Sequence, residues 1–256
     1  MKLTPNLEMN FRDMPFLDRV ACAADLGFTG ADMFRTKDRD IPALAAKLRK
    51  HKITIGMVVG SQLEVGLNDP EIHPEIEKSA EAAARDAAEI GALYVTVLSG
   101  NSLPKVSASQ QNRNIVDGLK RLIPIAEKYN VTILLEMLNS LYTHPGYYLD
   151  DTELMTSIIR TVGHPRVKGL YDIFHAGIMR GNIVEDIRAS IDAIGHFHIA
   201  GIPGRNEPIN GEQNYPMICR EIDKTGYEGY ISMEYTPRME PIESLKLNKA
   251  WIEGKK

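Results

Sequence analysis

Apolar, β-branched runs alternate with helical segments along the whole chain, and this alternation restricts the fold more than any other feature. Strands are expected at 3–9, 29–34, 53–59, 93–98, 131–136, 167–172, 195–200 and 229–234. Helices are expected at 13–26, 41–51, 74–90, 110–129, 151–162, 183–194, 215–225 and 242–251. Strict alternation of this kind is typical of a parallel sheet covered by helices. Eight such units in 256 residues predict one (β/α)8 barrel domain, 1–256.

An open, doubly wound sheet is the alternative to the barrel. No Gly-x-Gly-x-x-Gly follows the first strand, however, and no Gly-x-x-x-x-Gly-Lys-Ser/Thr loop is present. The barrel is therefore the favoured interpretation.

The first helix is expected to begin with Asp13 as its N-cap, because Pro15 suits a first helical turn.

Composition limits the function classes. The formal net charge of −4, without a cluster of basic and aromatic residues, argues against nucleic-acid binding. No apolar run approaches the roughly 18 residues of a membrane span, and the first residues contain no signal-peptide core. Cys22 and Cys219 lie far apart within predicted helices, which favours buried thiols in a reducing compartment. We expect a cytoplasmic protein without membrane or nucleic-acid partners.

The stretch 195–215 combines a short apolar strand with a long polar loop. Alternate strand residues share a face, so His196 and His198 are expected to point the same way near the end of the strand. The loop that follows is rich in Gly and Pro and carries Arg205 and Glu207. Taken alone, this stretch is explained equally well by a solvated connector and by a functional loop on a rigid scaffold.

Other strands end in the same kind of residue. Four predicted strands deliver possible metal ligands to the barrel rim: Glu136, Asp172, His198 and Glu234. Any one acid is explained as often by a buried Arg or Lys partner or by a helix cap. Three carboxylates together repel one another unless a cation is present. The set therefore predicts a divalent metal site, and three oxygens with one imidazole suit Mn²⁺, Mg²⁺ or Co²⁺.

Further polar residues are candidates for substrate contacts. His175 follows Asp172 by three residues and is placed to orient a substrate oxygen, to donate a hydrogen bond to a metal ligand, or simply to cap backbone. Arg205 is suited to a bidentate contact with a substrate carboxylate, or to pairing with Glu207, itself a weaker candidate for substrate binding. His196 is interpreted as a histidine that packs in the core or supports a metal ligand, rather than as a ligand itself.

The ligand set indicates a reaction type. A metal that binds two adjacent oxygens of an α-hydroxycarbonyl compound acidifies its carbon-bound proton and stabilises the enediolate. Glu136 and Glu234, three strands apart around the ring, approach such a carbon from different sides. We therefore predict that these two carboxylates take and return the proton while also serving as metal ligands.

Several motifs resemble the hydroxypyruvate isomerase family, one of the xylose isomerase-like TIM barrels, along essentially the whole chain. They are Asn-Leu-Glu-Met at 6–9, Gly-Asn-Ile at 181–183, His-Phe-His-Ile-Ala-Gly-Ile-Pro-Gly-Arg-Asn-Glu-Pro at 196–208, Gly-Glu-Gln-Asn-Tyr at 211–215 and Gly-Tyr-Glu-Gly at 226–229. The resemblance implies that Glu136 and Glu234 are the proton donor and acceptor and that Asp172 is a metal ligand. It also implies a small sugar or sugar-acid substrate and a homo-oligomer.

The chain departs from the family pattern in two places. His198 stands where hydroxypyruvate isomerases often have Gln, whereas related epimerases and inosose dehydratase have His. The segment 32–36 lacks the usual aromatic-rich Glu-Phe run. A sugar-acid isomerase is the first hypothesis, a ketose 3-epimerase of the tagatose or psicose type the second, and an inosose dehydratase-like lyase the third. Endonuclease IV, which belongs to the same superfamily, is disfavoured because it requires a larger, His-rich metal cluster and a basic surface.

Overall fold

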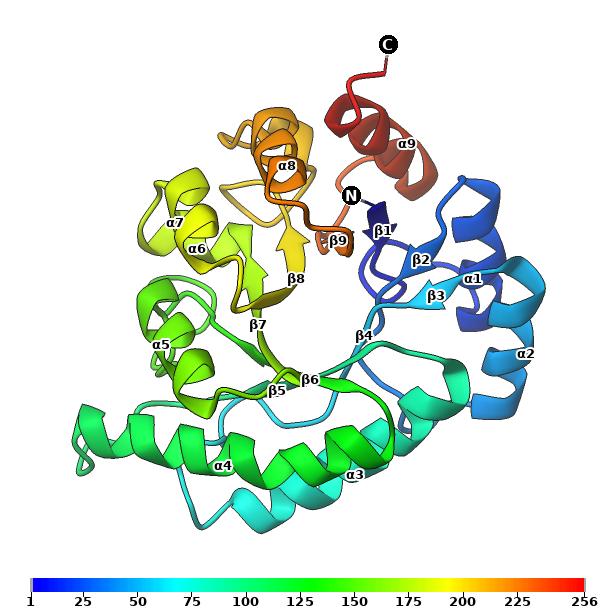
Figure 1. Cartoon of the computed structure of the whole chain (residues 1–256). Helices are drawn as coiled ribbons and strands as arrows, with labels where there is room; N and C mark the ends of the chain where they lie inside the picture. Colours follow the sequence, from blue (N-terminus) through cyan, green and yellow to red (C-terminus); the bar gives the residue numbers. More distant parts are fainter. Residues whose placement is uncertain (1, 256) are drawn as a thin grey trace.

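The computed structural model describes residues 2–255, whose strands form the wall of a barrel with helices packed around the outside (Figure 1). The strands are β1 Lys2–Pro5, β2 Gly30–Ala31, β3 Thr54–Ile55, β4 Met57–Val59, β5 Tyr94–Leu98, β6 Thr132–Glu136, β7 Val167–Asp172, β8 Ile194–Ile199 and β9 Tyr230–Met233. The α-helices are α1 Phe16–Asp25, α2 Ile41–His51, α3 His73–Ile90, α4 Ala108–Lys128, α5 Thr152–Val162, α6 Ile173–Met179, α7 Ile183–Ser190, α8 Tyr215–Lys224 and α9 Pro241–Ile252. A short 3-10 turn, η1, covers Pro208–Asn210.

The sheet is parallel and closes on itself. Seven strands follow the order β1-β9-β8-β7-β6-β5-β4, and β2 pairs with β3. Backbone hydrogen bonds join the remaining edges: Asp32 N donates to the Pro5 carbonyl at 2.9 Å, and Met33 N donates to the Met57 carbonyl at 3.2 Å. The predicted (β/α)8 barrel is confirmed, with the third predicted strand divided into β3 and β4.

The division between β3 and β4 falls at Gly56, where a buried side chain approaches the backbone closely. A Cβ atom built on Gly56 would lie 2.2 Å from Oδ1 of Asp32. The same oxygen accepts a hydrogen bond from the backbone N–H of Met57 at 3.2 Å. Only glycine leaves room for the Asp32 carboxylate at this point of the wall.

Two predicted helix boundaries were wrong. Helix α1 begins at Phe16 after Pro15, whose ψ of 137° is not helical, so Asp13 does not cap it. Helix α7 ends at Ser190 rather than 194, because the chain must turn before β8 begins at Ile194.

One helix was not predicted from the sequence. Helix α6 starts directly at the end of β7, where the side chain of Asp172 accepts a hydrogen bond from the N–H of Phe174 at 2.8 Å. This capping bond satisfies one of the free donors at the helix start and fixes the carboxylate of Asp172.

Alternation along the strands separates an apolar layer from a polar interior. On β8, Phe197 packs under the helices against the rings of Tyr171 and Tyr227, with ring centroids 5.9 and 4.9 Å apart. His196 and His198 face the opposite way, into the barrel, where both contact Asp32. The hydrophobic core therefore lies between sheet and helices, and polar groups occupy the inside of the ring.

The structure also bears on the expectations about membrane spans and about the two cysteines. Among residues 2–255, no helix is long and apolar enough to cross a membrane. Cys22 and Cys219 are both free, and burial raises the pKa of the Cys219 thiol to about 12. A thiol with so high a pKa is a poor nucleophile, which agrees with a packing role for Cys219.

Candidate metal centre

The predicted ligands lie at the carboxyl ends of neighbouring strands. Asp172 of β7 pairs with His198 of β8, and His198 pairs with Ser232 of β9. Residues paired in this way on parallel strands point to the same face. Glu136 ends β6 and Glu234 directly follows β9, so all four side chains reach the carboxyl end of the strands. This end is where active sites of such barrels lie.

The four predicted ligands form one compact, buried cluster. Glu136, Asp172, His198 and Glu234 each offer a ligand atom, and these atoms all lie within 4.8 Å of one another. Nδ1 of His198 lies 2.6 Å from Oε2 of Glu234 and 3.7 Å from Oε1 of Glu136. The structure thus brings together the whole set that was inferred from the strand ends.

Arg205 provides positive charge to the cluster. Its Nη2 lies 3.0 Å from Oδ2 of Asp172 and 2.7 Å from Oε2 of Glu234, and its side chain is 19% exposed. The residue has a φ of +57°, a left-handed conformation that is costly for a side chain other than glycine. The loop holds it through the N–H of Arg205, which donates to the Gly201 carbonyl at 3.0 Å.

Crowding of the carboxylates separates their pKa values. Burial raises the pKa of Glu136 to about 8; the charge of His198 acts against this, and the neighbouring acids Glu234 and Asp172 add to it. Burial likewise raises the pKa of Asp172, although Arg205 opposes it. Against burial, Arg205 and His198 lower the pKa of Glu234 to about 2. Without a metal, therefore, the cluster favours a protonated Glu136 beside an ionised Glu234.

The donor set fits a divalent cation. Nδ1 of His198 is buried and has no hydrogen-bond partner in the described part of the chain, although a carboxylate oxygen of Glu234 lies 2.6 Å away. Burial opposes protonation of this ring, but the charge of Glu234 and the hydrogen bond to Asp32 raise the pKa of His198 well above its usual value. Three buried carboxylates and one imidazole nitrogen at one point are the ligands that Mn²⁺, Co²⁺, Zn²⁺ and related ions take. A cation here would relieve the mutual repulsion of the acids.

Comparison with known proteins agrees with this geometry. Residues 20–254 match the model of the xylose isomerase-like TIM barrel family. The chain belongs to this family.

Relatives in the family carry isomerase names. The chain is 30% identical to a 2-oxo-tetronate isomerase of Pectobacterium atrosepticum, over 99% of both chains. It is 29% identical to the hydroxypyruvate isomerase of Escherichia coli, over 93% of this chain and 94% of the relative. The resemblance inferred from the sequence motifs is confirmed.

Solved structures share the architecture. A protein of Brucella melitensis described as an AP endonuclease of family 2 superposes with a TM-score of 0.89 at 25% identity, covering 95% of this chain and 96% of that one. The IOLI protein, solved with a bound zinc atom, gives a TM-score of 0.83 at 21% identity and covers 98% of both chains. This second likeness supports the fold alone.

His175, on helix α6, contacts the cluster through Asp172. Its Nδ1 accepts the backbone N–H of Asn139 at 3.1 Å, so the ring proton is on Nε2, which lies 3.3 Å from Oδ2 of Asp172. Burial and the charge of Arg205 lower the pKa of His175 well below its usual value. Nε2 of His175 contacts Asp172 but has no hydrogen-bond partner among the described residues.

Glu207 lies apart from the cluster. Its Oε1 accepts hydrogen bonds from the N–H groups of Arg238 and Met239, at 2.7 and 2.9 Å, and from the hydroxyl of Ser244 at 3.0 Å. The carboxylate ties the loop after β8 to the loop after β9. Its predicted contact with substrate remains a prediction, and Arg205 pairs with Asp172 and Glu234 instead of Glu207.

Two site residues were not predicted from the sequence. Asp32, completely buried beside β2, contacts both His196 and His198. His144 packs its ring against His175 with centroids 5.2 Å apart, and its pKa is lowered by burial and by the charge of Arg205. The sequence indicated a role for Asp32 only through its place near the end of a predicted strand. His144 lies in a loop, where no periodic pattern shows which way a side chain points.

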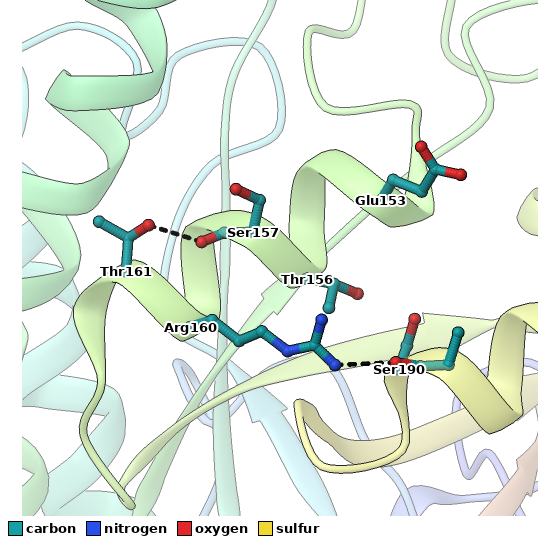
Figure 2. A pocket seen from close by; sticks show the side chains of 7 residues that line it. Glu153, Thr156, Ser157, Arg160, Thr161 and Ser190 are labelled. Carbon is teal, nitrogen blue, oxygen red and sulfur yellow. Dashed lines mark hydrogen bonds between the residues drawn. The ribbon is translucent and has the colours of Figure 1, made fainter.

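A cavity also lies on the outside of the barrel, away from these residues. A cavity of about 410 Å³ runs between α5 and α7, lined by Glu153, Thr156, Ser157, Arg160, Thr161, Ala189 and Ser190 (Figure 2). Its cation, Arg160, donates to the Ala189 carbonyl at 2.8 Å and pairs with Asp192 at 2.6 Å. None of the residues that line this cavity belongs to the four-residue cluster at the barrel rim.

Proposed function

We propose that the protein is a metal-dependent isomerase that interconverts an α-hydroxy ketone and an α-hydroxy aldehyde in a small sugar acid of the hydroxypyruvate or 2-oxo-tetronate class. The observation that carries the proposal is the buried cluster of Glu136, Asp172, His198 and Glu234 within 4.8 Å. The names of the two relatives, an isomerase of 2-oxo-tetronate and one of hydroxypyruvate, support the substrate class.

The reaction needs a proton to move between two adjacent carbons. A divalent cation at the four ligands would polarise the carbonyl group and favour loss of the neighbouring C–H proton. One of the two glutamates, Glu136 or Glu234, takes this proton, leaving an enediolate, and the other returns a proton to the former carbonyl carbon. The hydroxyl proton shifts between the two oxygens, so that the product is an isomer of the substrate.

Arg205 is suited to recognise a carboxylate. Its Nη2 is shared by Asp172 and Glu234, whereas its Nε is buried and has no partner among the described residues. The side chain of Arg205 is 19% exposed, so its guanidinium can bind a substrate carboxylate or carbonyl oxygen at the cluster after a shift that opens Nε. We therefore assign selection of sugar acids over free sugars to Arg205.

Proton exchange in D₂O, followed by NMR, tests this function. Mn²⁺-loaded enzyme would be incubated with hydroxypyruvate, a 2-oxo-tetronate or D-fructose. Each reaction would then be quenched, and the mixture would be freed of Mn²⁺ before the spectrum is recorded. The expected result is deuterium incorporation into a sugar acid together with formation of its aldehyde isomer. Metal-stripped enzyme and Glu243→Gln, a change of an acid on α9 whose side chain is 64% exposed, are the controls.

The outcomes separate the alternatives. Exchange only at C3 of D-fructose would replace the proposal with a ketose 3-epimerase, which is the second candidate because His198 stands where epimerases also have histidine. Loss of water from the substrate would instead indicate a lyase. Absence of exchange in every substrate would overturn the isomerase assignment. A nuclease is disfavoured by the net charge of −4.

A further inference from the structure

A second charged group lies below the metal centre, on the side away from the barrel mouth. Oδ2 of Asp32 lies 2.6 Å from Nε2 of His196 and 3.1 Å from Nε2 of His198. Its Oδ1 receives the N–H of Met57 at 3.2 Å. All three side chains, Asp32, His196 and His198, have no exposed surface. The proposed reaction uses none of these contacts directly.

The contacts determine which nitrogen of His198 is free. Oδ1 of Asp32 already accepts the N–H of Met57, and Oδ2 lies within hydrogen-bond distance of Nε2 of both histidines. A carboxylate placed in this way accepts from both rings, which puts a proton on Nε2 of His198. In the neutral His198 ring the only proton is then on Nε2, and Nδ1 carries the lone pair that can bind a cation. Nδ1 is the atom that faces Glu136 and Glu234.

We propose that Asp32 is a positioning residue for the metal centre, which holds the His198 ring through Nε2–H and presents Nδ1 to the cation. A carboxylate behind a metal-binding histidine fixes the ring orientation and makes the nitrogen a better ligand. The proposal goes beyond the four-residue ligand set and presupposes the metal of the proposed function. It also explains why a completely buried carboxylate is kept in the barrel interior, where an unpaired charge is costly.

Gly56 is part of the same arrangement. A Cβ atom at this position would meet Oδ1 of Asp32 at 2.2 Å, so any larger residue displaces the carboxylate. Displacement would lengthen the bond to His198, although no ionisable group is changed. Gly56→Ala therefore offers a second way to disturb the same contact.

Asp32, His196 and His198 could instead bind an ion of their own, since their ligand atoms also lie within 4.8 Å of one another. The 2.6 Å separation of Asp32 and His196 is that of a direct hydrogen bond. In addition, Nε2 of both histidines faces the same oxygen of Asp32. The geometry therefore favours a carboxylate that receives two N–H donors. One bound metal per chain is the corresponding expectation.

The test is the affinity for Mn²⁺, measured by titration calorimetry on the full-length metal-free protein. Asp32→Asn keeps the shape but cannot accept from both histidines and from Met57. We expect its Kd for Mn²⁺ to rise about 10–100-fold, the usual effect of removing such a partner. Thr96→Val is the matched control, because Thr96 is equally buried in the wall and its hydroxyl has no partner among the described residues.

Two further measurements distinguish positioning from a general loss of stability. In Zn²⁺-loaded protein labelled with ¹⁵N-histidine, the Nε2 proton of His198 should resonate far downfield in the wild type and move upfield in Asp32→Asn. The double variant Asp32→Asn with Gly56→Ala should bind Mn²⁺ no more weakly than Asp32→Asn alone. The reason is that both substitutions disturb the same hydrogen bond, the one between Asp32 and His198. If Asp32→Asn does not fold, Gly56→Ala alone carries the affinity test.

The possible failures differ from one another. Wild-type protein that binds no Mn²⁺ would overturn the metal centre itself, and with it the role of Asp32. Tight binding by the wild type with an unchanged Kd in Asp32→Asn would overturn only the positioning role and leave the isomerase proposal intact. Two metal ions per chain would show that Asp32 is a ligand rather than a positioning residue.

Discussion

The barrel mouth and the outer groove between α5 and α7 each place an arginine among acidic residues, but under opposite conditions. Arg205 is 19% exposed and shared by Asp172 and Glu234, whose side chains are 1% and 7% exposed. Arg160 and Asp192 form a pair whose side chains are 51% and 62% exposed. The outer groove offers a cavity of about 410 Å³ (Figure 2), and the side chain of its other charged residue, Glu153, is 76% exposed.

The difference shows what marks a functional site in this molecule. Charges in water cost little to maintain and contribute little when paired. Buried carboxylates are expensive unless they are paired or bound to a metal, and their pKa values move far from the usual range. Glu136, with a pKa of about 8, and Glu234, with a pKa of about 2, show this separation, which is typical of acid–base sites. The proposed site is therefore assigned from the chemical environment of its acids and not from the presence of a cavity.

The largest effect is expected from neutralising the two proposed proton carriers. Glu136→Gln and Glu234→Gln should each lower kcat by about 10²–10⁴-fold, because each removes a group that moves a proton as well as a ligand. Steady-state kinetics on the best substrate of the exchange experiment provides the measurement. Near-normal turnover in either variant would remove the two-carboxylate mechanism. The surface variant Glu243→Gln should match the wild type.

The next effect tests the comparison of the two arginines. In metal-free protein, Arg205→Met should lower the free energy of unfolding by about 3–5 kcal/mol, since it leaves two buried acids without their cation. Arg160→Met keeps a similar stem and should cause no measurable change, because its pair is exposed. Urea denaturation of both variants gives the two values. Equal losses would show that burial does not separate the two regions.

The smallest effect concerns pH. The pKa of Glu136 is raised from 4.5 to about 8 and that of His198 is also raised, so both hold protons near pH 6 that a cation must displace. Affinity for Mn²⁺ should therefore rise between about pH 6 and 8, by up to about tenfold per pH unit for each proton released. Calorimetry in two buffers of different ionisation enthalpy counts these protons. A Kd that does not change with pH would contradict the assignment.

The same raised pKa affects stability in a definite direction. Between its usual pKa of 4.5 and its folded-state pKa of about 8, Glu136 stays protonated in the folded protein while the unfolded chain has lost the proton. The metal-free protein should therefore lose stability as the pH rises through this window. Glu136→Gln should weaken that pH dependence, and it should also release one proton fewer on binding Mn²⁺.

Several features of the fold and site could be predicted from local patterns. The eight βα units were visible because strand and helix periodicities alternate regularly, and the ligands at 136, 172, 198 and 234 were visible because each lies at or near the end of an apolar run. Helix α6 was not predicted, because the short segment after Asp172 starts at a strand end and has its cap in the strand itself. The break at Gly56 was likewise hidden within an apolar run.

The sequence by itself determined that parallel strands meet at one mouth and which acids and histidines end them, because these properties depend on residues close together in the chain. Only the tertiary structure decided that Asp32 meets His196 and His198, residues 164 and 166 positions away. That contact depends on how the strands are staggered when the sheet closes, which no local pattern encodes. Likewise, only the folded loop after β8 decided that Arg205 pairs with Asp172 and Glu234 rather than with its sequence neighbour Glu207.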